Sequence, residues 1–100
     1  MAKGLVSADI TDPDGYKQYL AESGKAFAKF GARFLVRGGP SEQMEGKGRS
    51  RFVVLEFKDY TTALECYRSP EYAIARAARN GRAMFDLVIV DGYDGPQPAV

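Results

Sequence analysis

Four side chains have types and positions that suit the binding of a small organic anion: Arg37, Glu56, Tyr72 and Arg79. A guanidinium such as that of Arg37 can hold a carboxylate with two parallel hydrogen bonds. Glu56 interrupts an apolar segment, and surroundings of low dielectric constant would raise its pKa enough for general-base chemistry. Asp86 interrupts a second apolar segment and is the other candidate proton acceptor. These residues predict a ligand site or a site of proton transfer.

The string YRSPEY, residues 67–72, adds a second group of candidates. Tyr72, Arg76 and Arg79 recur at intervals of four and three, so they would share one stripe of a helix. The free N–H groups at the start of that helix attract negative charge. Together they would suit a carboxylated or enolic molecule. A capped helix break with packed tyrosines and solvated arginines explains the same residues without a site, and both interpretations stay open.

The polar residues of the expected strands also allow two interpretations. Ser7 and Asp9 share one parity of the first strand, and Arg33 and Arg37 share one parity of the second. If several of these side chains point into one interior, they line a small cavity with a polar floor. Alternatively, Arg37 and Glu56 form a structural ion pair or lie at strand ends in water, because buried charges need partners.

The composition excludes several classes of chemistry. The 100 residues contain 14 Lys plus Arg and 13 Asp plus Glu, so the net charge of +1 gives no reason to expect a nucleic-acid partner. The chain has no histidine, which excludes Ser-His-Asp and Cys-His catalysis, histidine zinc sites and proximal-histidine haem ligation. Cys66 is the only cysteine and is typical of a small buried hydrophobe. We expect neither metal nor cofactor.

The hydropathy of the sequence bears on the cellular location of the protein. No apolar run approaches the roughly 18 residues of a membrane span. The N-terminus lacks the apolar core of a signal peptide. We therefore expect a cytoplasmic protein without a membrane partner.

The order of the patterns is β-α-β-β-α-β. Strand patterns occur at residues 3–10, 32–38, 50–58 and 83–92, and helical patterns follow at 13–30 and 60–80. Asp12 and Asp59 are expected to cap the helices. Pro70 forces Ser69 out of helical geometry, so the second helix should split into two angled pieces. Residues 1–92 would form one domain, and 93–100 a tail that is an arm or disordered.

This order predicts a ferredoxin-like α+β fold, a four-stranded antiparallel sheet with helices on one face. The uncovered face of such a sheet normally carries polar residues. Strands 50–58 and 83–92 are largely apolar at both parities, so the second face needs a cover. The chain has no further helix to provide one, and we expect a homodimer joined through the sheets. Edge effects and short strands are the alternative explanation of the pattern.

Several strings resemble one known family. They are TDPDGYKQY, RFLVRGG, RFVVLEFKDYTTALECYRSPEY, an arginine eight residues after Glu71, and VIVDG. Together they resemble the domain of unknown function family thirteen-thirty of the dimeric α/β-barrel superfamily, over residues 3–92. The resemblance implies two ferredoxin-like sheets that face each other and enclose a barrel. It implies no settled activity, but Tyr72 and Arg79 match the family pattern.

The wider superfamily includes cofactor-free monooxygenases, lactone isomerases, haem-dependent enzymes and stress-related binding proteins. The haem branch relies on histidine and the monooxygenase branch on Trp, Asn and His, whereas Asn80 is the only one of these residues present here. The leading hypothesis is a homodimer that binds a small anionic organic molecule in its barrel cavity. One alternative is a cofactor-free isomerase or oxygenase-like enzyme, with Glu56 or Asp86 as proton acceptor and an arginine that stabilises the enolate. Another is a structural or interaction protein with a packed barrel.

Overall fold

The computed structural model describes residues 2–99, and the side chains of residues 5 and 7–99. Its elements in chain order are β1 (Ala2–Ile10), α1 (Pro13–Lys29), β2 (Arg33–Arg37), β3 (Arg51–Phe57), α2 (Tyr60–Arg68), α3 (Pro70–Arg79) and β4 (Ala83–Val90). The predicted order, including the split second helix, is confirmed. The last strand ends earlier than predicted, at Val90.

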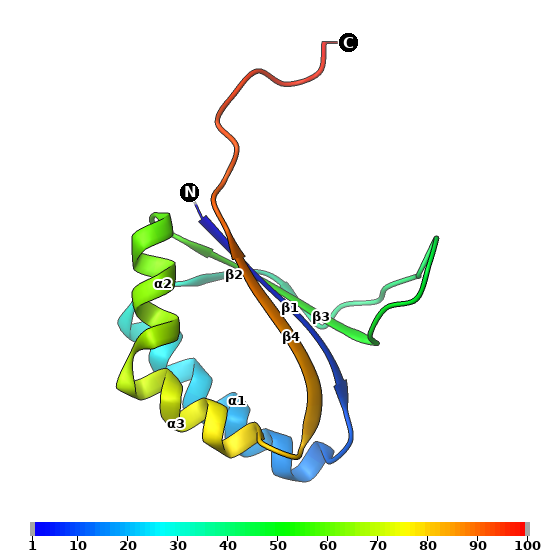
Figure 1. Cartoon of the computed structure of the whole chain (residues 1–100), viewed down its shortest axis with the longest axis vertical. Coiled ribbons are helices and arrows are strands. Elements are labelled where there is room, and N and C mark those ends of the chain that lie inside the picture. The colour runs from blue at the N-terminus through cyan, green and yellow to red at the C-terminus, as the bar shows by residue number, and fades with distance from the viewer. Residues whose placement is uncertain (1, 100) are drawn as a thin grey trace.

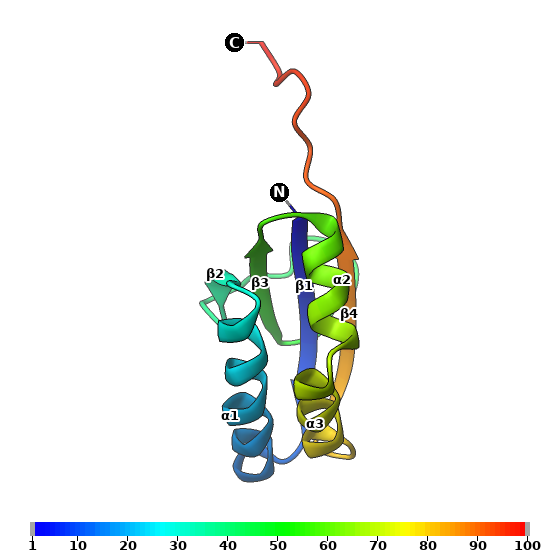
Figure 2. The same ribbon diagram turned by 90° about the vertical axis from the view of Figure 1, so that its left-hand side faces the viewer.

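The four strands form one sheet in the order β2-β3-β1-β4, and every neighbouring pair is antiparallel. All three helices cover the same face of this sheet (Figure 1). In Figure 2, α1 lies in front of the β2 side of the sheet, whereas α2 and α3 lie in front of the β4 side. This arrangement is the predicted ferredoxin-like α+β fold.

Aspartate caps start two of the helices where the sequence predicted them. Asp12 Oδ1 accepts a hydrogen bond from the Gly15 N–H at 3.1 Å. Asp59 Oδ1 accepts one from the Thr62 N–H at 2.7 Å. Each carboxylate satisfies a backbone donor that the first helical turn leaves free, and each lies near the positive end of the helix dipole.

The break in YRSPEY turns a tyrosine into the core. Ser69 has extended backbone angles, and Pro70 begins α3 directly after it. The Ser69 hydroxyl donates to the Cys66 carbonyl at 2.7 Å and accepts from the Tyr72 N–H at 3.1 Å. Because this serine ends α2 and caps α3 at once, the direction of the chain changes there. Tyr72 consequently points under the helices and is only 1% exposed.

The core lies between the helices and the sheet. Its buried cluster consists of Tyr16, Tyr19, Ala26, Leu55, Phe57, Ala63, Cys66, Tyr72 and Ala75. Burial along β4 alternates strictly, so its odd-numbered residues face the helices and its even-numbered residues face away. We call the uncovered surface the open face. Its residues are Leu5, Ser7, Asp9, Phe52, Val54, Glu56, Met84, Asp86, Val88 and Val90, with Arg33 and Val36 from β2.

An irregularity in β2 overturns one prediction. Arg33 pairs in register with Glu56 on the open face, but the register shifts between Phe34 and Val36. The extra residue reverses the alternation of side chains along the rest of the strand. Arg37 therefore lies opposite Val53 and faces the helices. The expectation that Arg33 and Arg37 share a face is wrong, because it assumed unbroken alternation.

Two segments extend beyond the packed body. Residues 38–50 connect β2 to β3 and project from the end of the sheet, and residues 91–99 leave β4 as an extended tail (Figure 1). Within the tail, the Tyr93 hydroxyl donates to the Pro96 carbonyl at 2.7 Å. Among the described helices, none has the length and apolar character needed to cross a membrane.

Candidate functional site

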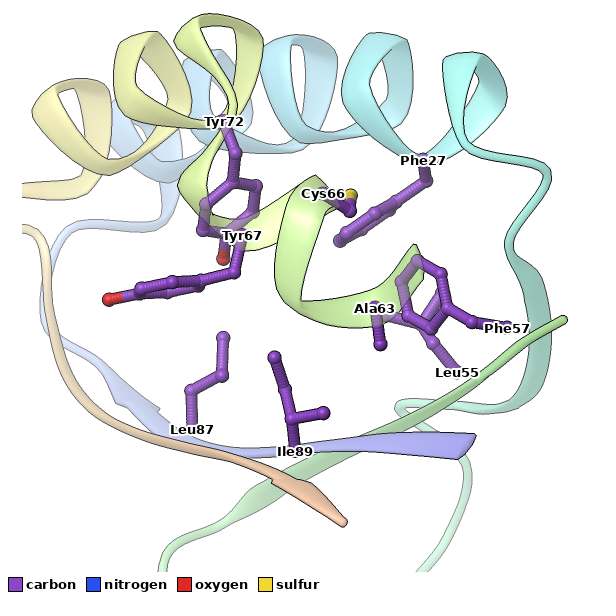
Figure 3. A pocket seen from close by; sticks show the side chains of 9 residues that line it. All are labelled: Phe27, Leu55, Phe57, Ala63, Cys66, Tyr67, Tyr72, Leu87 and Ile89. Atoms are coloured by element: carbon purple, nitrogen blue, oxygen red, sulfur yellow. The ribbon is translucent and has the colours of Figure 1, made fainter. Parts of the chain in front are cut away.

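Two small cavities lie between the helices and the sheet. The first, the apolar cavity, has a volume of about 20 Å³. Its lining residues are Phe27, Leu55, Phe57, Ala63, Cys66, Tyr67, Tyr72, Leu87 and Ile89. In Figure 3, Leu87 and Ile89 point up from β4 toward the helices, and Phe27 and Tyr72 point down from α1 and α3. Burial raises the pKa of the Cys66 thiol to about 11, so this wall stays uncharged.

The second cavity, the arginine cavity, has a volume of about 40 Å³ and lies between α1 and the strands β2 and β3. Its lining residues are Tyr16, Tyr19, Leu20, Ser23, Gly24, Phe27, Phe34, Arg37, Arg51, Val53 and Leu55. The bulge in β2 is what places Arg37 here. Phe27 and Leu55 line both cavities, so these two side chains form the wall between them.

A pair of buried tyrosines connects the two cavities. The hydroxyl oxygens of Tyr19 and Tyr72 lie 2.7 Å apart, and their rings meet edge to face. Tyr19 lines the arginine cavity, and Tyr72 lines the apolar cavity. Burial raises the pKa of both phenols above the ordinary value. Both hydroxyls therefore keep their protons at neutral pH.

Between the helices and the sheet, Arg37, Arg51 and Arg79 have no carboxylate partner among the described residues. The exposed Arg68 and Arg76 of the helices have none either, and Arg76 lies over the Tyr67 ring. The Arg79 guanidinium lies 3.9 Å from the ring centroid of Phe85, and that of Arg37 lies 4.5 Å from the ring centroid of Phe34. Aromatic rings therefore lie against Arg37 and Arg79, and the Arg79 guanidinium also interacts with the Tyr72 hydroxyl. The buried Nε donors of Arg51 and Arg79 lack an acceptor among the described residues.

On the open face the arginines are paired. Arg33 Nη2 lies 2.9 Å from Glu56 Oε1, and the Glu56 side chain is 11% exposed. Arg49 bridges two carboxylates, with Nε 2.7 Å from Asp86 Oδ2 and Nη1 3.3 Å from Asp9 Oδ2. The backbone N–H of Ser50 also donates to Asp9 and lowers the pKa of that carboxyl. This face therefore has no unpaired guanidinium among the described side chains.

The open face carries two wide hollows. One has a volume of about 380 Å³ and lies over apolar side chains such as Leu5 and Val88. The other has a volume of about 510 Å³ and lies under the 38–50 segment, where Asp9 and Arg49 line it. Ser7 and Asp86 line both hollows. Their volumes are in the range of ligand sites, but both lie on the uncovered surface of the sheet.

The structure divides the sequence-predicted residues into two groups. Arg37, Tyr72 and Arg79 lie on the helix side, whereas Glu56 and Asp86 lie on the open face. The four ligand candidates do not share one cavity. The proposed ion pair between Arg37 and Glu56 does not form, since the bulge turns Arg37 to the other face.

Sequence reasoning missed three residues of these sites. Arg51 and Tyr16 line the arginine cavity, and Arg49 joins two strands on the open face. Tyr16 lies within the helical pattern predicted for residues 13–30, but nothing in the sequence placed it beside a cation. Arg49 lies in a glycine-rich segment, and its partners are distant along the chain. Among the described residues, no group of three or more His, Cys, Asp or Glu side chains could hold a metal ion.

The fold and the cavities define a small ferredoxin-like α+β protein with a tyrosine-rich helix side. The sequence matches the family "Domain of unknown function (DUF1330)" over residues 4–93, so the chain belongs to that family. A comparison with curated proteins gave no match.

Solved structures share this fold at low sequence identity. A protein of unknown function from Rhodopseudomonas palustris, RPA0582, is 18% identical with a TM-score of 0.69, over 94% of this chain and 83% of that one. A putative antibiotic biosynthesis monooxygenase from Nitrosomonas europaea is 17% identical with a TM-score of 0.64, over 92% and 98% of the two chains. SnoaB, a cofactor-independent oxygenase from Streptomyces nogalater, is 11% identical with a TM-score of 0.62, over 97% and 94%. At these identities the likeness establishes the fold alone.

Proposed function

We propose that this protein binds a small anionic organic molecule on the helix side of its sheet, as one subunit of a homodimer. The observation that carries the proposal is the contrast between the two faces. The arginines of the open face are paired with carboxylates, whereas Arg37, Arg51 and Arg79 have no carboxylate partner among the described residues. A ligand that supplies the missing negative charge is the simplest complement to this arrangement.

The buried donors strengthen the argument. A buried N–H group without an acceptor costs about 1–3 kcal/mol. The Nε atoms of Arg51 and Arg79 are two such groups. A carboxylate oxygen beside either guanidinium would remove this cost. Aromatic rings already restrict the side chains of Arg37 and Arg79, so these side chains would lose little conformational entropy when an anion binds.

The homodimer follows from the open face. Its exposed large apolar side chains are Leu5, Val36, Met84, Val88 and Val90. An apolar patch of this kind on a sheet face is typical of an interaction surface. A second copy related by a two-fold axis would cover it with the same surface. The open hollows would then become enclosed space between two sheets.

The enzyme alternative has less support. Glu56 is paired with Arg33, and Asp86 accepts a hydrogen bond from Arg49. Each carboxylate would have to release an arginine before it could accept a substrate proton. In addition, the unpaired arginines that would stabilise an enolate lie on the other side of the sheet.

Calorimetric titration with a panel of sodium carboxylates at constant ionic strength tests the binding proposal. Arg37→Gln and Arg51→Gln should each weaken binding about tenfold, because both residues line the arginine cavity and each substitution removes charge-assisted hydrogen bonds. Arg68→Gln is the matched control: it removes one positive charge from the exposed surface of α2 and should leave binding unchanged. A protein that binds no carboxylate, or equal affinities in all three variants, would contradict the proposal.

A further inference from the structure

We infer that the ligand is an amphiphilic monocarboxylate: its head group occupies the arginine cavity, and its apolar body continues into the apolar cavity. This inference rests on the proposed function and specifies the class of anion. It assigns the head group to Arg37, Arg51 and Tyr16, two of which no sequence pattern indicated.

The head-group site combines two cations with a neutral donor. Arg37, Arg51 and Tyr16 all line the arginine cavity. Burial raises the pKa of Tyr16, although the nearby Arg51 opposes this effect, so its hydroxyl keeps the proton and can donate. The cavity of about 40 Å³ exceeds the roughly 10–15 Å³ that one water needs. It suits a carboxylate group better than a whole organic molecule.

A glycine turn gives Arg51 its place. Gly38 follows Arg37 with a positive φ of 68°, and its N–H donates to the Phe52 carbonyl at 2.8 Å. A Cβ atom built at Gly38 would collide with the Arg51 guanidinium. The missing side chain therefore lets two guanidinium-bearing residues approach the same cavity from neighbouring strands.

The lining of the apolar cavity determines which kind of ligand body can bind. Phe27 and Leu55 separate the two cavities, and beyond them the walls are apolar. The Tyr72 hydroxyl there is already bonded to Tyr19. A second charge on the ligand would lie in this region without a partner, at a high cost in desolvation. A dicarboxylate or a phosphate should consequently bind more weakly than a monocarboxylate with an aliphatic or aromatic body.

The two residues that separate the cavities differ in burial. Leu55 is buried in the middle of the sheet, whereas the Phe27 ring is only partly buried. Phe27 meets Phe34 on one side and Tyr72 on the other, each at 5.9 Å between ring centroids. The apolar body would take the position of the Phe27 ring, because the two cavities are too small to hold it as they stand.

The test is a titration of the full-length protein with acetate, butyrate, hexanoate and phenylacetate, and with succinate and phosphate, at pH 7 and constant ionic strength. Each buried methylene should tighten binding about fourfold. Hexanoate should therefore bind far more tightly than acetate, and succinate and phosphate should bind less tightly than butyrate. Arg51→Gln should weaken all the monocarboxylates about tenfold.

Substitutions in the apolar cavity distinguish the contribution of the ligand's apolar body to affinity from that of its carboxylate. Ala63→Leu fills this cavity and should reduce the affinity for hexanoate to near that for acetate, while acetate binding stays unchanged. Ile89→Phe fills the same cavity from a more exposed position and serves if Ala63→Leu fails to fold. Arg68→Gln, at an exposed residue that lines neither cavity, should match the unsubstituted protein throughout.

The outcomes distinguish this inference from the proposed function. Affinity that is independent of chain length, or phosphate and succinate that bind as tightly as hexanoate, would overturn the amphiphilic class. If Arg37→Gln still weakens binding in that case, the anion site itself survives. Absence of binding by any anion would overturn both.

Discussion

The hydroxyl groups of Tyr19 and Tyr72 lie 2.7 Å apart, and this hydrogen bond joins α1 to α3 at the boundary between the two helix-side cavities. Tyr72 reaches this position because Ser69 and Pro70 restart the helix just before it. The helix break in YRSPEY therefore places the Tyr72 hydroxyl beside its buried partner, Tyr19, on α1. Rings of Phe27 and Tyr67 flank the pair.

The first prediction concerns this hydrogen bond. Tyr72→Phe and Tyr19→Phe should each lower the free energy of unfolding by about 1–2 kcal/mol, since each leaves the other buried hydroxyl without a partner. The double substitution should cost clearly less than the sum of the two, because it leaves no unpaired hydroxyl. Urea denaturation of the four proteins measures this coupling. Strictly additive effects would mean that the hydrogen bond does not stabilise the fold.

The second prediction concerns the homodimer. Val88 lies on the open face, is 53% exposed and is paired in register with Leu5. A charge at this point would be buried without a partner between two sheets. Light scattering at micromolar concentration should therefore show a dimer of the 11.0 kDa chain for the parent protein and a monomer for Val88→Asp. Ile74→Asp is the control, because Ile74 is 57% exposed on the outer surface of α3. A parent protein that is already monomeric would contradict the dimer.

Local signals explain which parts of the fold could be predicted from the sequence. The caps at Asp12 and Asp59 depend on residues within the next turn. The break at Ser69 and Pro70 follows from the backbone geometry of proline. Apolar residues at both parities predicted that the uncovered face carries apolar side chains, and Val88 is one of them. Each of these features is decided by a few neighbouring residues.

The candidate site was harder to predict, because its geometry depends on distant residues. The bulge in β2 moved Arg37 to the helix side, and no glycine or proline within Arg33–Arg37 announced it. Arg49 meets Asp9 and Asp86 only because the sheet brings three segments together. Such pairings become visible only once register and topology are known.

The third prediction concerns Cys66. Burial raises the pKa of its thiol to about 11, well above that of an ordinary cysteine. Since only the thiolate reacts, a disulfide reagent at pH 8 should modify the native protein at least about 100-fold more slowly than the protein unfolded in urea. Absorbance of the released thiolate measures both rates. Equal rates would show that this thiol is accessible, and that the apolar cavity opens widely in solution.

The fourth prediction concerns acid stability. The hydroxyl of Thr62, followed by its backbone N–H, holds the pKa of Asp59 below its ordinary range. The backbone N–H of Gly15, followed by Arg82, does the same for the pKa of Asp12. Because the folded-state pKa is lowered, their contribution is complete above the unfolded value near 3.9 and is lost as the pH falls below it. Unfolding free energy should be level from about pH 5 to 7 and decline below about pH 4.

Amide variants test the origin of that decline. Asp59→Asn keeps a capping oxygen but removes the titrating group, so the loss of stability below about pH 4 should become less steep. Asp12→Asn should act in the same way. Urea denaturation at a series of pH values gives the slopes. Unchanged slopes in both variants would mean that other carboxylates control acid unfolding.

The most direct test of the helix-side site is an NMR titration that observes the arginine Nε–Hε groups of the ¹⁵N-labelled protein while sodium hexanoate replaces sodium chloride at constant ionic strength. We predict that the signals of Arg37 and Arg51 move in proportion to occupancy, whereas those of Arg33 and Arg49 on the open face stay in place. Movement of the open-face signals alone, or of none of the four, would contradict an anion site between the helices and the sheet.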